Sequence, residues 1–226
     1  FDAPEPEHAD VSLREQTPNR KGDADLHAGY DQNPQFSPDG KFVAWLSMEH
    51  DGYESDRLRL CVYDLAAGQC TYVTEGFESG VNEFCWAPDS RNLYFTGVWH
   101  GKTQIYLTNL KGRHRALTDD VADYSLIGLA ADGVTLLAKR HSMSRADEIF
   151  VIPTQKGRAI SQLTEVNRAF YDRLAWGEVK ERWVNTTDGQ SELCWVVYPP
   201  HFDPNKKYPV LLFCEGGPQS PVSQFW

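Results

Sequence analysis

Short stretches in which apolar and polar positions alternate return at regular intervals along most of the chain. Residues 59–65, 104–110 and 148–154 share this pattern, and each is followed by an apolar residue and a threonine. Alternation with a period of two is typical of a β-strand that is buried on one face. A spacing of roughly 45 residues predicts a repeated unit that is built from such strands.

A turn signature precedes each alternating stretch. Residues 36–40 read Phe-Ser-Pro-Asp-Gly, residues 86–90 read Trp-Ala-Pro-Asp-Ser, and residues 129–133 read Leu-Ala-Ala-Asp-Gly. Proline presets the first corner of a turn, and aspartate and glycine tolerate the bend. We expect one strand before this turn, one after it, the alternating strand third, and a short fourth strand beyond a glycine-containing turn. Four strands per ~40–45 residues are typical of a β-propeller blade.

The fold that this pattern predicts is mainly β, with a partial β-propeller of about three four-stranded blades. Closed propellers have about four to eight blades, so we expect other chain segments to complete the ring. The predicted organisation is the tail of a preceding blade or a linker over residues 1–30, the partial propeller over residues 31–175, and the first strands of another domain over residues 176–226.

The repeat stops after Val166, and a different pattern begins. Residues 178–184 and 192–197 alternate and are joined by Thr187-Asp188-Gly189, which predicts a hairpin. A proline-rich loop then leads to the apolar residues 210–214, which predict a strand buried on both faces of a sheet. Gly216 and Gly217 follow, and two interpretations stay open for them. They form either a loop whose backbone amides approach a ligand, as in an oxyanion hole, or a simple strand-ending turn.

Charge and cysteine content narrow the possible functions. A net charge of −10 opposes binding to nucleic acids and anionic membranes, and no apolar run approaches the ~20 residues of a membrane span. The five cysteines include no CxxC pair, so we expect neither a zinc site nor a complete disulfide framework. If Leu65 pairs with Cys70, Cys61 falls opposite Thr74, and these two thiols do not meet.

The order of the motifs resembles the prolyl-oligopeptidase family of serine peptidases, with the dipeptidyl-peptidase and acylaminoacyl-peptidase branches the most similar. The resemblance spans residues 31–226 and rests on the repeated blades followed by Thr187-Asp188-Gly189, Tyr198-Pro199-Pro200, Lys207-Tyr208-Pro209 and Gly216-Gly217-Pro218. The blade motif is shared with TolB-like and other propellers. Its join to this particular strand and Gly-Gly-Pro is more specific.

This resemblance implies a propeller that caps an α/β-hydrolase domain and filters peptide substrates by size. The family's nucleophilic serine lies in a G-x-S-x-G turn and is followed by Asp and His. The 226 residues contain no such turn, so we expect them to be inactive alone. Gly216 and Gly217 are the candidates for the oxyanion loop. The expected partners are a peptide substrate and the remainder of the propeller and hydrolase domain, with no metal or organic cofactor, and the expected location is periplasmic or secreted.

Glu215 departs from the family pattern, which usually places Tyr or His before the glycine pair. An ionised carboxylate cannot donate a hydrogen bond to an oxyanion, so we expect Glu215 to face the substrate and pair with a cationic N-terminus. In dipeptidyl members, acids of propeller loops resembling residues 50–57 bind the substrate amine. Glu54 and Asp56 are therefore candidate amine anchors, with ordinary salt bridging as the alternative role.

Two other functions stay open. A TolB-like propeller can act as a protein-binding module without catalysis, and a hydrolase of the same fold can act on esters rather than peptides. The stretch from Tyr198 to Pro218 argues against the first, because a binding propeller has no use for it. The propeller argues against the second, because small esters need no size filter.

Overall fold

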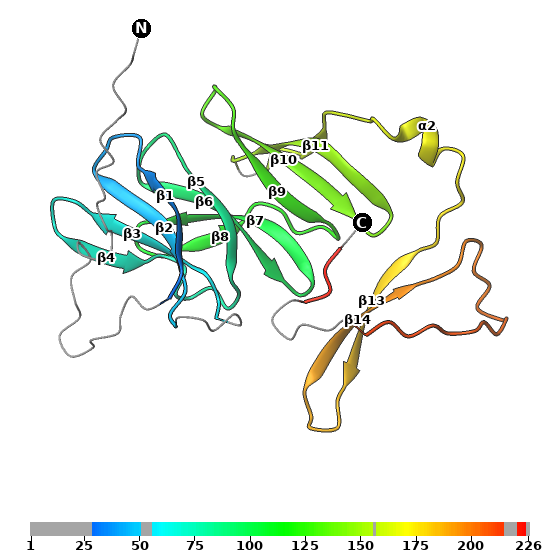
Figure 1. The fold of residues 1–226 in the computed structure, drawn as a ribbon. Helices are drawn as coiled ribbons and strands as arrows, with labels where there is room; N and C mark the ends of the chain where they lie inside the picture. The colour runs from blue at the N-terminus through cyan, green and yellow to red at the C-terminus, as the bar shows by residue number, and fades with distance from the viewer. Residues whose placement is uncertain (1–28, 51–55, 156, 215–220, 225–226) are drawn as a thin grey trace, which may run out of the picture.

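Three four-stranded antiparallel sheets stand side by side in the computed structural model, which describes residues 29–50, 56–155, 157–214 and 221–224 (Figure 1). In each sheet the strands pair in chain order. The first blade comprises β1 (Asp31–Phe36), β2 (Phe42–Ser47), β3 (Arg59–Asp64) and β4 (Gln69–Tyr72). The second comprises β5 (Val81–Trp86), β6 (Asn92–Trp99), β7 (Lys102–Asn109) and β8 (His114–Ala116). The third comprises β9 (Asp123–Leu129), β10 (Thr135–Ser142), β11 (Arg145–Pro153) and β12 (Ser161–Gln162). The predicted partial propeller of three four-stranded blades is confirmed.

The aspartate of each turn signature closes the turn between the first two strands of its blade. Oδ1 of Asp89 accepts hydrogen bonds from the backbone N–H groups of Arg91 and Asn92, at 2.9 and 3.0 Å. Asp132 does the same for the corresponding two residues of the third blade, both at 3.0 Å. Asp39 accepts the hydroxyl of Ser37 at 2.7 Å. The motif repeats because a short side-chain acceptor is needed at the same corner of each blade.

The threonine after each alternating strand also has one repeated role. The fourth strands are short, so an N–H group of each third strand lies beyond the paired residues and needs another acceptor. The hydroxyl groups of Thr74, Thr118 and Thr164 supply it. Their donors are the N–H groups of Leu60, Ile105 and Ile149, at 2.8, 2.9 and 2.9 Å.

Apolar side chains of facing sheets fill the space between neighbouring blades. Full burial of one such side chain stabilises the fold by about 1.5–3 kcal/mol, so packing between blades outweighs any single polar contact. The core between the first and second blades includes Leu46, Leu60, Leu93 and Phe95. The core between the second and third blades includes Ile105, Leu136, Ala138 and Ile152.

A short helix and a hairpin follow the blades. The helix is α2 (Arg168–Tyr171), and the hairpin joins β13 (Val179–Asn185) to β14 (Ser191–Val197). The hairpin confirms the prediction for this stretch, and its turn contains Gly189 with a φ of 84°. No helix within the described ranges is long and apolar enough to cross a membrane.

The strand predicted over residues 210–214 is not formed. Among the described residues this stretch is unpaired, and Val210, Leu211, Leu212 and Phe213 are 81–97% exposed rather than buried. A β-strand requires a neighbour that satisfies its backbone N–H and C=O groups. The described part of the chain supplies none at this position, so the apolar composition alone does not produce a strand.

The predicted pairing across the β3–β4 turn is also wrong. Cys70 pairs with Tyr63 rather than with Leu65, and Cys61 lies opposite Tyr72 rather than Thr74. The cause is the carboxylate of Asp64, which accepts two backbone N–H groups of the turn and starts it one residue early. This register makes Cys61 and Cys70 diagonal neighbours on one face of the sheet, so the prediction that the two thiols do not meet is wrong. Burial, followed by the hydrogen-bonded Cys70 thiol, raises the pKa of Cys61 well above its ordinary value.

Candidate functional site at the junction of blades and hairpin

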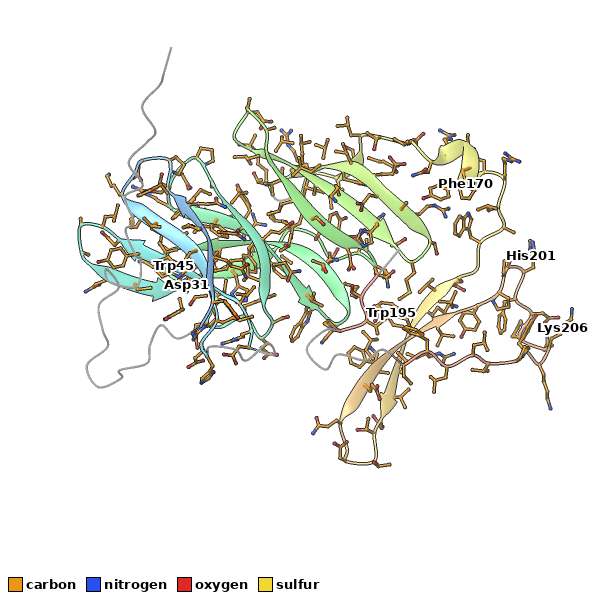
Figure 2. The ribbon with its side chains drawn as sticks, viewed as in Figure 1. Asp31, Trp45, Phe170, Trp195, His201 and Lys206 are labelled. Carbon is orange, nitrogen blue, oxygen red and sulfur yellow. The ribbon has the colours of Figure 1, made fainter. Side chains whose placement is uncertain are left out.

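The tip of the second blade contacts the β13–β14 hairpin. Nζ of Lys102 lies 2.8 Å from Oε1 of Glu181, and both side chains are partly shielded from solvent. The ring of His100 packs edge-on against Trp183, with 5.0 Å between the ring centroids. We use the term junction for the region where four parts of the chain meet (Figure 2). These parts are residues 99–102, the β13–β14 hairpin, residues 221–224, and the third-blade side chains that contact them.

Gly101 is required at the junction for two reasons. Its φ of 64° lies in the left-handed region, where residues other than glycine are strained. A Cβ atom there would lie 2.9 Å from Leu193 Cδ2, 3.0 Å from the carbonyl oxygen of Val222 and 3.1 Å from Trp195 Nε1. The hairpin and residues 221–224 therefore approach the backbone of the second blade more closely than a side chain allows.

Residues 221–224 run between the β6–β7 turn and the third blade (red in Figure 1). The indole Nε1 of Trp195 donates a hydrogen bond to the carbonyl oxygen of Val222 at 3.1 Å. The backbone N–H of Gln224 donates to Oδ2 of Asp123 at 2.9 Å, and Gln224 is fully buried. The main chain of this segment is thus held at two points, by the hairpin on one side and by the propeller on the other.

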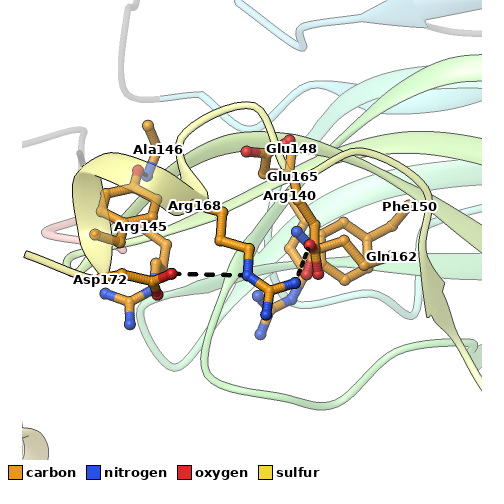
Figure 3. A pocket seen from close by; sticks show the side chains of 10 residues that line it. Arg140, Arg145, Ala146, Glu148, Phe150, Gln162, Glu165, Arg168 and Asp172 are labelled. Carbon is orange, nitrogen blue, oxygen red and sulfur yellow. Dashed lines mark hydrogen bonds and ion pairs between the residues drawn. The ribbon is translucent and has the colours of Figure 1, made fainter.

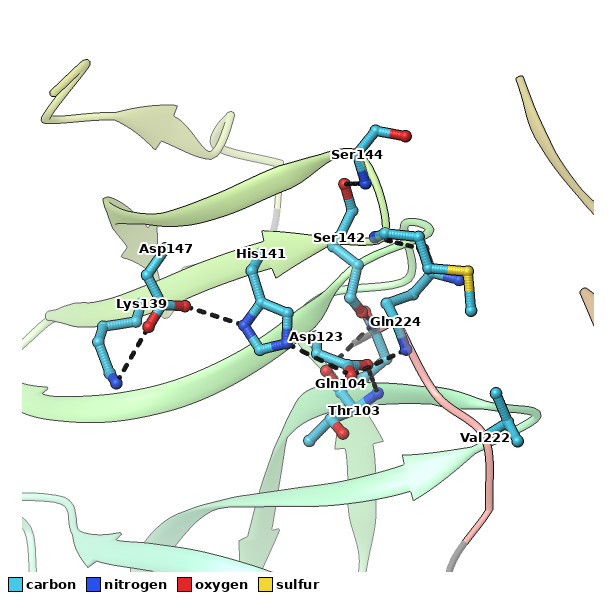
Figure 4. Close-up of polar contacts among 12 residues, drawn as sticks. Thr103, Gln104, Asp123, Lys139, His141, Ser142, Ser144, Asp147, Val222 and Gln224 are labelled. Atoms are coloured by element: carbon cyan, nitrogen blue, oxygen red, sulfur yellow. Dashed lines mark hydrogen bonds and ion pairs between the residues drawn. The ribbon is translucent and has the colours of Figure 1, made fainter. Parts of the chain in front are cut away.

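The carboxylate of Asp123 joins three parts of the molecule (Figure 4). Asp123 is the first residue of β9 and is buried. Its Oδ1 accepts the backbone N–H of Thr103 in the second blade at 2.7 Å, and its Oδ2 accepts that of Gln224. Nε2 of His141 lies 3.7 Å from Oδ2. A buried carboxylate is costly unless it is hydrogen-bonded or paired, and these groups meet that requirement.

His141 lies between two carboxylates. Its Nδ1 is 2.9 Å from Oδ1 of Asp147, and Nζ of Lys139 is 3.2 Å from Oδ2 of the same group (Figure 4). Partial burial opposes ionisation of Asp147, but the hydrogen bonds from His141 and Lys139 outweigh it and hold the pKa of that carboxyl below its ordinary value. The imidazole is therefore oriented by Asp147 while its other nitrogen faces Asp123.

Most of the predicted site residues fall outside the described part of the chain: Glu54, Glu215, Gly216 and Gly217. Asp56 is described, and its Oδ2 accepts the backbone N–H of His50 at 2.7 Å and lies 2.8 Å from His50 Nδ1. Burial raises the pKa of Asp56, but the hydrogen bonds from His50 outweigh it and leave that pKa below its ordinary value. Its role as an amine anchor stays a prediction.

A cavity of about 330 Å³ lies between the third blade and α2 (Figure 3). Its lining contains three arginines and three carboxylates, so the opposite charges are equal in number. Arg168 pairs with Glu165 at 2.8 Å and with Asp172 at 3.8 Å, and Arg140, also in its wall, pairs with Asp120. Such a balanced lining gives no preference for an anion or a cation, so we place the candidate site at the junction instead.

Sequence reasoning missed Asp123, although the repeat contained a signal. Asp31 and Asp123 open the first strands of their blades, and they pair with Ser47 and His141 respectively. Asp31 accepts the indole N–H of Trp45 at 3.1 Å, a contact within its own blade. The repeat therefore marks the first residue of the blade as a position for aspartate. It does not predict the contact of Asp123 with Gln224, which depends on the path of residues 221–224.

Curated proteins are similar in sequence to most of this chain. It is 47% identical over 199 residues to a dipeptidyl-peptidase 5 of Porphyromonas gingivalis, which covers 88% of this chain and 29% of that protein. It is 43% identical over 199 residues to a dipeptidyl-peptidase 5 of Porphyromonas endodontalis, covering 88% and 28%. The chain thus spans less than a third of the length of these relatives. No protein-family model matches it.

Solved structures support the fold. An acylaminoacyl peptidase in complex with Z-Gly-Gly-Phe-chloromethyl ketone superposes with a TM-score of 0.59 at 20% sequence identity, over 76% of this chain and 25% of the other. At this identity the similarity concerns the fold alone. Together with the curated relatives it confirms the resemblance that the sequence predicted. The chain is related to the prolyl-oligopeptidase family of serine peptidases, with two dipeptidyl-peptidase 5 proteins among its relatives.

Proposed function

We propose that this chain is the part of a serine exopeptidase that joins the propeller to the hydrolase domain, and that the whole protein releases dipeptides from peptide N-termini. The observation that carries this proposal is the 47% identity to a dipeptidyl-peptidase 5 over 199 residues. The compared region includes little of a hydrolase domain. The activity of the whole protein therefore requires a direct test.

Gly216 and Gly217 are the proposed oxyanion donors. In acyl transfer, negative charge develops on the carbonyl oxygen, and preorganised backbone N–H groups stabilise it. Residues 221–224 follow the glycine pair in the sequence and are bound by the hairpin and the third blade, which supports this role. The nucleophilic serine, with its Asp and His, is supplied by chain outside the 226 residues, which are inactive alone.

Glu215 is the proposed partner of the substrate's N-terminal ammonium group. A carboxylate beside the oxyanion donors opposes the developing charge unless a cation neutralises it, and a free peptide amine is such a cation. Glu54 and Asp56 are further amine anchors in this proposal.

The propeller has two proposed roles for the whole enzyme. It caps the hydrolase domain and admits only small peptides to the active site. It also supports the junction. The partners are a peptide substrate and the remaining propeller and hydrolase segments. We place the enzyme in the periplasm or outside the cell, which fractionation of cells that express the native gene would test.

The first experiment uses the full-length protein encoded by the native reading frame. That frame is expected to contain a G-x-S-x-G sequence beyond Trp226, followed by Asp and His. The purified protein is expected to release p-nitroaniline from dipeptidyl p-nitroanilides and to lose this activity after labelling with a fluorophosphonate. The 226-residue chain alone is the negative control. A reading frame without that serine would defeat the proposal and favour a TolB-like propeller that binds proteins without catalysis.

The second experiment tests Glu215 in the full-length enzyme. Glu215→Gln keeps the shape of the side chain but removes its charge. KM is expected to rise about tenfold or more for substrates with a free amine, since one buried charge-assisted contact is worth about 1.5–3 kcal/mol. KM for the same peptides with an acetylated N-terminus is expected to stay within about twofold. Equal effects on both substrates would rule out the amine contact.

A further inference from the structure

The cavity between the third blade and α2 contains one positive and one negative side chain that lack ionic partners. The charged residues of its lining are Arg140, Arg145, Glu148, Glu165, Arg168 and Asp172. Four of them are already committed, because Arg168 pairs with Glu165 and Asp172, and Arg140 pairs with a carboxylate outside the lining. Among the described residues, no ion pair is formed by Arg145 or Glu148. A ligand that carries both charges would therefore complete this lining.

The guanidinium of Arg145 is packed between two aromatic rings at the exposed end of the cavity. Its Cζ lies 4.8 Å from the ring centroid of Tyr171 and 4.8 Å from that of Trp176. Its Nη1 donates a hydrogen bond to the carbonyl oxygen of Ser144 at 2.7 Å, a neutral group that leaves the positive charge uncompensated. The planar fork of N–H donors of an arginine matches a carboxylate. Because Arg145 is exposed, a carboxylate in solution can reach it.

The carboxylate of Glu148 is the buried negative group, with the residue only 7% exposed. It accepts the hydroxyl of Thr164 and, at 3.1 Å, the backbone N–H of Asn167. Burial raises the pKa of Glu148, but these hydrogen bonds outweigh it and leave that pKa below its ordinary value, so the group is ionised at neutral pH. Both donors are neutral, and a carboxylate has about four lone-pair sites. Glu148 can therefore still accept a hydrogen bond from an ammonium group.

The separation of the two groups sets the size of the ligand. Arg145 and Glu148 are three positions apart on β11, and a strand rises about 3.4 Å per residue, so their backbones are about 10 Å apart. A two-residue peptide, which spans up to about 7 Å, fits that separation better than a free amino acid, whose two charges share one carbon. The cavity volume of about 330 Å³ lies at the lower end of the about 300–1,000 Å³ of small-molecule sites. Phe150 adds an apolar side chain to the wall (Figure 3).

We propose that this cavity binds dipeptides whose two ends are free. The C-terminal carboxylate binds Arg145 at the exposed end, the N-terminal ammonium group binds Glu148 at the buried end, and an apolar side chain contacts Phe150. A longer peptide carries its carboxylate too far from its ammonium group to bind both residues. The dipeptides that the whole protein is proposed to release belong to this class, but the inference does not depend on that reaction.

The test measures dipeptide binding to the full-length protein by isothermal titration calorimetry. Labelling with a fluorophosphonate first blocks the nucleophilic serine, so that binding to that serine does not contribute. The probes are glycyl-leucine, glycyl-leucinamide, which lacks the carboxylate, and N-acetylglycyl-leucine, which lacks the ammonium group. Glycyl-leucine is expected to bind about tenfold or more tightly than either capped form, because each cap removes one charge-assisted contact.

Two variants assign the contacts to the cavity. Arg145→Gln should weaken glycyl-leucine about tenfold and leave glycyl-leucinamide within about twofold, so the preference for a free carboxylate is lost. Glu148→Gln should in the same way remove the preference for a free ammonium group over the acetylated form. Arg158→Gln is the matched control, because Arg158 is an exposed arginine of the same blade that does not line the cavity. It should leave all three affinities within about twofold.

The outcomes separate the inference from the proposed function. An active protein that binds no glycyl-leucine after labelling, or in which Arg145→Gln behaves like Arg158→Gln, overturns the inference alone. An inactive protein is titrated without labelling, and charge-dependent binding that Arg145→Gln weakens then supports the inference while the proposed function fails. If the buried Glu148→Gln variant does not fold, the exposed Arg145 still decides, through the comparison of glycyl-leucine with its amide.

Discussion

A histidine and an aspartate six positions later form a pair in both the first and the third blade, but in the first blade they follow β2, and in the third they belong to β10 and β11. In the first blade, Nδ1 of His50 lies 2.8 Å from Asp56, six positions later. In the third blade, Nδ1 of His141 lies 2.9 Å from Asp147, also six positions later. The third-blade histidine in addition turns Nε2 toward Asp123 at the junction.

The comparison separates what the repeat provides from what the junction adds. In both blades the histidine and the aspartate contact one another, although the elements that carry them differ. At the junction, the second ring nitrogen of His141 also faces the buried carboxylate of Asp123, which binds Gln224. A contact of functional interest therefore arises where the repeated geometry meets a segment from outside the propeller, as it does at residues 221–224. The following variants test this distinction.

The largest effect is expected from an alanine at Gly101, compared with one at Gly40 in the first blade. Both glycines have a positive φ, 64° and 70°, but a Cβ on Gly40 meets no atom within 4 Å. Gly40→Ala should lower the free energy of unfolding by about 1–2 kcal/mol through backbone strain alone. Gly101→Ala should lower it by about 2–5 kcal/mol, because overpacking against the hairpin and Val222 is added.

Urea unfolding of the two full-length variants gives this difference. The effect of Gly101→Ala is also expected at the junction itself, as faster proteolysis after residues of the β13–β14 hairpin. Equal losses in the two variants would mean that the junction tolerates a wider separation than the structure shows.

A smaller effect is expected from the two histidines. His141→Ala should lower the free energy of unfolding by about 1–2 kcal/mol, because the buried carboxylate of Asp123 loses the side chain that faces Oδ2. His50→Ala removes an exposed pair in the first blade and should lower it by less than about 1 kcal/mol. His141→Gln, which keeps a donor, should recover part of the loss. Urea unfolding that gives equal losses for both alanine variants would remove the distinction between the blades.

The propeller was predictable because its signals are local. The aspartate of each turn and the threonine after each third strand satisfy backbone groups of their own blade, so the sequence pattern and the hydrogen bonds coincide. The β3–β4 register was not predictable, since the carboxylate of Asp64 moved the turn. The junction was not predictable either. Its central contact joins Asp123 to Gln224, and only the path of the folded chain brings these residues together.

The smallest expected effect concerns acid stability, to which both histidine–aspartate pairs should contribute. Hydrogen bonds from the histidines hold the pKa values of Asp56 and Asp147 below the ordinary value of about 4, despite the opposing effect of burial. A folded-state pKa below the unfolded value adds stability above about pH 4 that is lost as the pH falls through the folded value. Asp56→Asn and Asp147→Asn should therefore flatten the fall of the melting temperature below pH 4.

Asp56 should contribute more, because its side chain is 14% exposed and that of Asp147 is 44% exposed. An acid slope unchanged by either substitution would show that these pairs orient their side chains without stabilising the fold.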